Sequence, residues 1–81
     1  MTNADRVAVV NALSEYLHRN PEACDTLDGI ANWWLGGEWS QRTDLVQDAL
    51  DELEEIGVIE RIHASDGRIR YRRRRPDRGV H

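Results

Sequence analysis

Hydrophobic residues recur at helical spacing in three separate segments of this chain. The first stripe comprises Val9, Val10, Leu13, Tyr16 and Leu17, the second Leu27, Ile30, Ala31, Trp34 and Leu35, and the third Leu45, Val46, Ala49, Leu50, Leu53 and Ile56. Residues three or four positions apart share one face of a helix, so each stripe predicts an amphipathic helix that packs through that face. The third is the most amphipathic, because its other side is mainly acidic.

Residues that favour the starts and ends of helices flank each stripe. The candidate N-caps are Thr2 or Asn3, then Asp25 or Thr26, and then Ser40 or Thr43. The predicted ends are Asn20-Pro21, Gly36-Gly37 and Gly57. Gly29 lies inside the second stripe, where glycine costs about 1 kcal/mol relative to alanine, so close helix packing is expected there.

After the third helix the apolar period changes from helical to two. This pattern predicts a strand, a turn and a return strand over residues 58–63, 64–67 and 68–72. Alternation along the return strand places Ile69 and Tyr71 toward the core and the arginines at 68, 70 and 72 toward solvent. The expected fold class is therefore α+β, with three helices followed by a two-stranded β-hairpin.

The length of 81 residues predicts one small domain, which we place at residues 1–75, with a disordered tail over residues 76–81. A domain of this size buries only about 60% of the surface of its unfolded chain, which leaves little room for an enclosed active site. The sequence has no apolar run long enough to span a membrane and no secretory signal pattern. Its single cysteine, Cys24, suits a reducing environment, so a cytoplasmic location is expected.

Charge is divided unevenly along the chain. Residues 1–60 carry 13 acidic residues and 3 arginines, a net −10, whereas residues 61–81 carry 8 arginines and 2 aspartates, a net +6. There is no lysine, so these cations are guanidinium groups, which bind phosphates and carboxylates in a bidentate manner. A basic strip on an acidic body favours an anionic partner bound at the C-terminal quarter.

Residues of the third predicted helix and of the predicted hairpin resemble the winged helix-turn-helix family. The resemblance is carried by the run A-L-x-x-L-x-x-x-G-V-I-x-R over residues 49–61, by Asp66-Gly67 in the turn and by Tyr71 in the return strand, and it covers about residues 4–73. The segment from Asp25 to Leu35 looks like the helix that precedes the recognition helix, and it is also similar to small uncharacterised bacterial proteins. The resemblance implies a three-helix winged helix-turn-helix with a C-terminal hairpin wing.

In that family the third helix enters the DNA major groove and the wing contacts the flanking backbone. The positions that would face the groove are Gln41, Arg42, Asp44, Gln47, Asp48 and Asp51. Three aspartates on this face oppose the phosphate charge, which leaves Gln41 and Arg42 as candidate readers. The candidate phosphate contacts of the wing are Arg68, Arg70, Arg72, Arg73, Arg74 and Arg75.

The sequence therefore favours a DNA-binding module of transcription-regulator type, gripping phosphates through its wing. The alternative for the arginines is a solubilising strip that pairs with the acidic third helix. A second hypothesis is a protein-interaction module that uses Trp33, Trp39 and that acidic helix, since tryptophan is enriched at binding hot spots. Both tryptophans could instead cover a thin core. The acidic helix could also dock the wing of a second copy, giving a homodimer.

Enzymatic and metal chemistry have little support. The histidines at 18, 63 and 81 and Cys24 lack the paired short spacings of zinc sites. No basic residue neighbours Cys24 in the sequence, and no pattern pairs carboxylates in a pocket. We therefore expect no cofactor, no small-molecule substrate and no catalytic residue.

Overall fold

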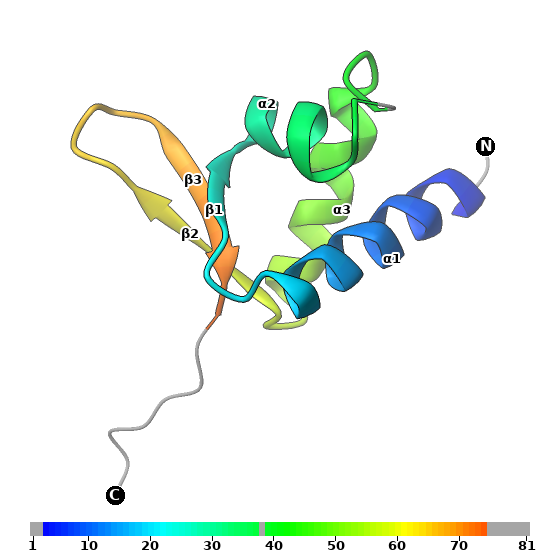
Figure 1. Cartoon of the computed structure of the whole chain (residues 1–81), viewed down its shortest axis with the longest axis horizontal. Helices are drawn as coiled ribbons and strands as arrows, with labels where there is room; N and C mark the ends of the chain where they lie inside the picture. Colours follow the sequence, from blue (N-terminus) through cyan, green and yellow to red (C-terminus); the bar gives the residue numbers. More distant parts are fainter. Residues whose placement is uncertain (1–2, 38, 75–81) are drawn as a thin grey trace, which may run out of the picture.

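The computed structural model describes residues 3–37 and 39–74. Its elements, in chain order, are α1 (Asn3–Arg19), β1 (Cys24–Thr26), α2 (Leu27–Gly29), the π-helix η1 (Ile30–Trp34), α3 (Thr43–Glu55), β2 (Ile59–His63) and β3 (Ile69–Arg73). Because η1 continues α2, the two together form the second predicted helix. The predicted α+β class, with three helices and a C-terminal hairpin, is confirmed and is compatible with a winged-helix arrangement (Figure 1).

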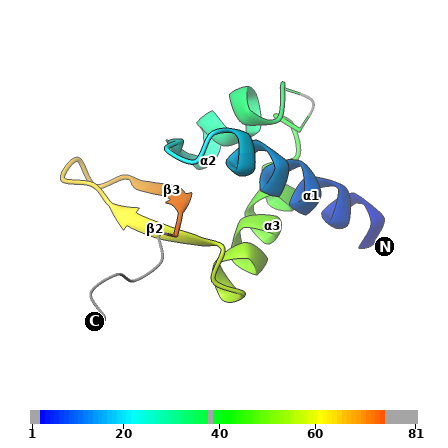
Figure 2. The same cartoon turned by 60° about the horizontal axis from the view of Figure 1, so that its bottom comes forward.

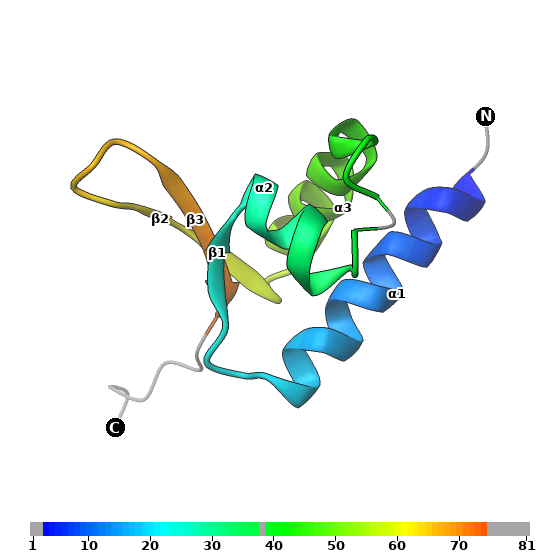
Figure 3. The same cartoon turned by 45° about the horizontal axis from the view of Figure 1, so that its top comes forward.

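The three strands form one antiparallel sheet in the order β1-β3-β2. The sequence did not predict β1, which pairs Cys24 with Arg72 and Thr26 with Arg70. Figure 3 shows β1 beside β3, followed directly by α2. The return strand is therefore the central strand of the sheet, and the hairpin extends from the helices on one side of the molecule (Figure 2).

The two faces of the sheet follow from burial of Tyr71, which is only 4% exposed and belongs to the core. Side chains alternate between faces along a strand, so residues that share the face of Tyr71 point toward α3. We call the opposite side the outer face. It carries Cys24 and Thr26 from β1, Glu60 and Ile62 from β2, and Arg70 and Arg72 from β3.

All three helical stripes supply the core, as predicted. Its buried residues are Val9, Leu13, Leu17, Ile30, Ala31, Leu35, Val46, Ala49, Leu50, Leu53, Ile59 and Tyr71. Each fully buried leucine or isoleucine contributes about 1.5–3 kcal/mol to folding. Ile56 was wrongly assigned to the apolar face of the third helix. It lies just after α3 ends and is 63% exposed.

The end of α3 directs the chain into the sheet. Gly57 has a φ of 86°, its N–H donates to the carbonyl of Glu54 at 3.1 Å, and the N–H of Val58 donates to the carbonyl of Leu53 at 2.8 Å. This pair of bonds is a Schellman motif, and its left-handed position favours glycine. The predicted helix end at Gly57 is confirmed.

Helix starts were predicted less well. Thr26, one of the two candidate N-caps of the second helix, is the N-cap of α2, and its Oγ1 accepts a hydrogen bond from Gly29 N at 3.3 Å. For the third helix both candidate caps were wrong. Arg42 occupies the N-cap position without a side-chain capping bond, and Thr43 is already helical. Thr2 and the predicted tail lie outside the described residues.

Gly29 is held in close contact with Asp25. A methyl group on Gly29 would overlap the carboxylate of Asp25, whose Oδ1 accepts from Thr26 N at 2.7 Å. The three atoms nearest to that position all belong to Asp25 of β1 and not to another helix, so the contact joins β1 to the first turn of α2.

We expect Gly29→Ala to destabilise the protein by about 1 kcal/mol, because the overpacking cost of about 1–3 kcal/mol exceeds the gain in helix propensity. In an Asp25→Ala background the same substitution should be neutral or stabilising, since the clash is gone. Urea denaturation of the two single variants and the double variant measures this coupling. Equal destabilisation by Gly29→Ala in both backgrounds would contradict the assignment.

Candidate nucleic-acid interface

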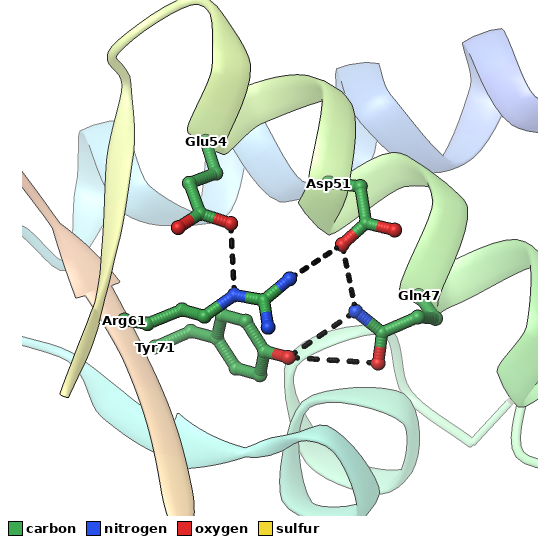
Figure 4. A network of polar contacts seen from close by, with 5 residues as sticks. All are labelled: Gln47, Asp51, Glu54, Arg61 and Tyr71. Carbon is green, nitrogen blue, oxygen red and sulfur yellow. Dashed lines mark hydrogen bonds and ion pairs between the residues drawn. The ribbon is translucent and has the colours of Figure 1, made fainter. Parts of the chain in front are cut away.

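A polar network on the inner side of the sheet ties β2 and β3 to α3 (Figure 4). Arg61 of β2 donates from Nε to Glu54 Oε1 and from NH2 to Asp51 Oδ1, each at 2.8 Å. Its guanidinium carbon lies 5.7 Å from the centroid of the Tyr71 ring, within the range of a cation–π contact. The hydrogen bond to Glu54 raises the pKa of Arg61 above its ordinary value. Arg61 therefore serves as an internal link.

The same network engages residues of α3 that were predicted to face a DNA groove. Gln47 donates from Nε2 to Asp51 Oδ1 at 2.9 Å and to Tyr71 Oη at 3.2 Å. Breaking these bonds to contact a base would oppose binding. Gln47 and Asp51 are consequently poor candidates for base recognition.

Gln41 and Arg42, the two predicted readers, are both exposed before α3. Arg42 is held by Asp44 through two hydrogen bonds, Nε to Oδ1 at 3.2 Å and NH2 to Oδ2 at 3.3 Å. The bond from Arg42 lowers the pKa of Asp44, which stays ionised at neutral pH. A phosphate or base at Arg42 would meet this carboxylate first, so Gln41 is the freer of the two.

The remaining exposed surface of α3 is acidic. An open concavity between α1 and α3 is lined by Arg6 and by Asp48, Asp51, Glu52 and Glu55. Arg6 is bonded to Glu52 at 3.4 Å, so the positive charge there is already paired. This surface disfavours a phosphate backbone.

The sheet brings the predicted wing arginines together on one side. Arg70 and Arg72 occupy the outer face, and Arg68 precedes them by the same two-residue step. Arg68 is exposed as predicted. The strand register also directs Arg70 and Arg72 away from the core, as predicted, with side chains 38% and 43% exposed. Each of the two is in an ion pair, since Arg70 Nη2 lies 3.4 Å from Asp66 Oδ2 and Arg72 Nε lies 2.7 Å from Glu60 Oε2.

Asp66 also organises the hairpin turn. Its Oδ1 accepts from Arg68 N at 2.9 Å, and this bond lowers the pKa of Asp66, with the charge of Arg70 acting in the same direction. The sequence predicted Asp66 in the turn, but not its ion pair with Arg70 or the ion pair of Glu60 with Arg72. Glu60 is brought to Arg72 by the register of β2 and β3, which places the two residues directly opposite each other.

The three further arginines do not simply extend this row. Arg73 lies opposite Ile59 and so belongs to the other face of the sheet, with an exposed side chain. Arg74 is exposed, and its N–H continues the ladder by donating to Val58 O at 2.8 Å. Arg75 lies outside the described residues.

The two tryptophans predicted to bind a partner differ in exposure. Trp33 is 76% exposed, whereas Trp39 is half-buried and packs against the core. Their neighbour Trp34 stacks on Tyr16 with ring centroids 4.8 Å apart. Trp33 alone of the predicted pair is available as a contact, and Trp39 covers the core.

Within residues 3–37 and 39–74, histidine, cysteine, aspartate and glutamate side chains form no group of three that could hold a metal ion. None of the helices in the described ranges has the length and apolar character needed to cross a membrane.

Comparison with protein-family models, with curated proteins and with solved structures found no match for this chain. Membership of the winged helix-turn-helix family therefore remains a prediction. The function must be argued from the geometry of the arginines.

Arg61→Gln is expected to lower the free energy of unfolding by about 1 kcal/mol, since it removes two solvent-accessible ion pairs and a cation–π contact. The matched control is Arg19→Gln, which removes one exposed ion pair to Glu15 on α1 and should cost about 0.5 kcal/mol or less. Urea denaturation monitored by circular dichroism compares the two variants. Equal losses would show that Arg61 does not link the sheet to α3.

Proposed function

We propose that this chain is a non-enzymatic binding module that attaches to nucleic acid through the outer face of its sheet. The observation that carries the proposal is the row of Arg68, Arg70 and Arg72 along one side of the central strand. The contact is with phosphates, so affinity depends strongly on salt and little on base sequence.

The spacing and donors of the row support phosphate binding. Alternate residues on one face of a strand lie about 6.6 Å apart, which is comparable with the separation of successive phosphates along a nucleic-acid strand. A guanidinium has five N–H donors, and Arg72 uses its Nε for Glu60, which leaves its terminal nitrogens for a phosphate. Arg68 is exposed and has no side-chain ion pair within the described ranges, whereas the other two arginines of the row each have one.

The charges of α3 support docking by the sheet and not by the third helix. Its exposed side is acidic, and Gln47 and Asp51 are committed to the network with Tyr71 and Arg61. Turning this side toward a duplex would bring like charges together. A role in transcription regulation would then need a second source of specificity, such as a partner protein. We place this activity in the cytoplasm, which suits the single unpaired Cys24.

A second candidate function, a protein-interaction module, is favoured by the exposure of Trp33. An exposed tryptophan can supply much of the binding energy of an interface when the partner removes its indole ring from water. Under this alternative Trp33→Ala abolishes capture of a partner, while substitution of the wing arginines leaves capture unchanged.

For the leading proposal we expect wild-type protein to bind a fluorescent 20-base-pair duplex at low salt. Three phosphate contacts predict a slope of about −2.7 in the logarithmic salt plot, or roughly a 40-fold loss of affinity between 50 and 200 mM NaCl. Arg68→Gln/Arg70→Gln should reduce the magnitude of this slope by about 2. Fluorescence anisotropy measures both quantities.

The matched control is Arg6→Gln/Arg19→Gln, which changes net charge equally on α1 and should leave the slope unchanged. Duplexes of unrelated sequence should bind within about twofold of one another. The proposal is abandoned if wild-type protein fails to bind at 20 mM NaCl, or if the two double variants lose affinity equally.

A further inference from the structure

Two of the three arginines in the row already hold a carboxylate. Glu60 lies directly across the ladder from Arg72, with Oε2 at 2.7 Å from Nε, and the two side chains are 35% and 43% exposed. Asp66 lies 3.4 Å from Arg70. A carboxylate and a phosphate accept hydrogen bonds from the same guanidinium donors, so each carboxylate stands in a position that a phosphate would use.

The two carboxylates differ in what else they do. Asp66 has a second role, because its Oδ1 accepts from Arg68 N and holds the turn. The bond of Glu60 to Arg72 is much the shorter and links adjacent strands. Glu60 can therefore be altered with less effect on the turn, and its effect falls on one identified arginine.

We propose that Glu60 is an internal competitor for the phosphate at Arg72, and that it restricts the outer face to polymeric anions. This inference rests on the proposed nucleic-acid binding. The carboxylate is held beside Arg72 by the strand pairing, so its local concentration is high and a free phosphate ion competes poorly with it.

A polyanion avoids this disadvantage. It first engages Arg68, which has no side-chain ion pair among the described residues, and the next phosphates of the same strand are then delivered to Arg70 and Arg72 at high effective concentration. The carboxylate of Glu60 stays next to the phosphate bound at Arg72 and repels it. The face consequently binds a chain of phosphates, and binds it more weakly than three free arginines would.

The test compares Glu60→Gln with Glu15→Gln, using the full chain and the same fluorescent duplex. Each variant removes one negative charge from an arginine ion pair, but Glu15 pairs with Arg19 on α1 at 3.1 Å, away from the sheet. We expect Glu60→Gln to tighten binding about two- to fivefold, the range given by an exposed ion pair. Glu15→Gln should show only the smaller, long-range effect of net charge.

A double-variant cycle locates the effect. In an Arg72→Gln background Glu60→Gln should no longer tighten binding, since the competed donor is absent. Glu60→Thr, which suits a strand, serves as a second variant if the glutamine form is poorly folded by circular dichroism. Inorganic phosphate up to about 10 mM should not displace the duplex from wild-type protein beyond the effect of its ionic strength. The same phosphate should displace the duplex more effectively from the Glu60→Gln variant.

The outcomes separate the two proposals. Equal affinities for Glu60→Gln and Glu15→Gln, with wild-type binding intact and dependent on the wing arginines, would overturn the role of Glu60 and leave the proposed function standing. Failure of the wild type to bind the duplex at low salt would overturn both.

Discussion

Burial of Tyr71 against α3 is the interaction on which the rest of the structure depends. Its ring lies in the core, its hydroxyl meets Gln47, and it stands between Arg61 on one neighbouring strand and Asp25 on the other. Because successive side chains of a strand alternate, fixing this one residue inward fixes its neighbours outward. The arginine row therefore follows from the packing of a tyrosine, and a slip of one residue would bury guanidinium groups.

The distribution of charge follows from the same packing. The inner side of the sheet gives one arginine, Arg61, to the acids of α3, and the outer side keeps the row at 68, 70 and 72 with two acids nearby. Each pair is accessible to water, so it contributes little to stability and leaves donors available. The molecule thus has an acidic helical side and a sheet whose positive charge is only partly neutralised, which supports contact with an anion by the sheet.

Local patterns predicted the parts of the fold that depend on local sequence. The three stripes gave the helices, and Gly57 gave the end of α3, because periodicity and left-handed backbone are encoded within a few residues. Strand β1 has three residues, too few to show alternation, and it exists because β3 pairs with it from far along the chain. The predicted strands, 58–63 and 68–72, agree to within one residue with the observed bounds, Ile59–His63 and Ile69–Arg73, but the sequence predicted no residue pairs between them.

The lack of predicted residue pairs explains what was missed at the candidate site. The direction of the arginines depends only on alternation, so it could be predicted, whereas the partners Glu60 and Asp66 depend on pairing across the hairpin.

The strand order also bears on how the protein folds during synthesis. The edge strands β1 and β2 each pair with β3 alone, and β3 is translated after both of them. The sheet therefore cannot begin to form on the ribosome until β3 has emerged, and the helices form before it. Until then the backbone groups of β1 and β2 are unpaired and can pair with other nascent chains.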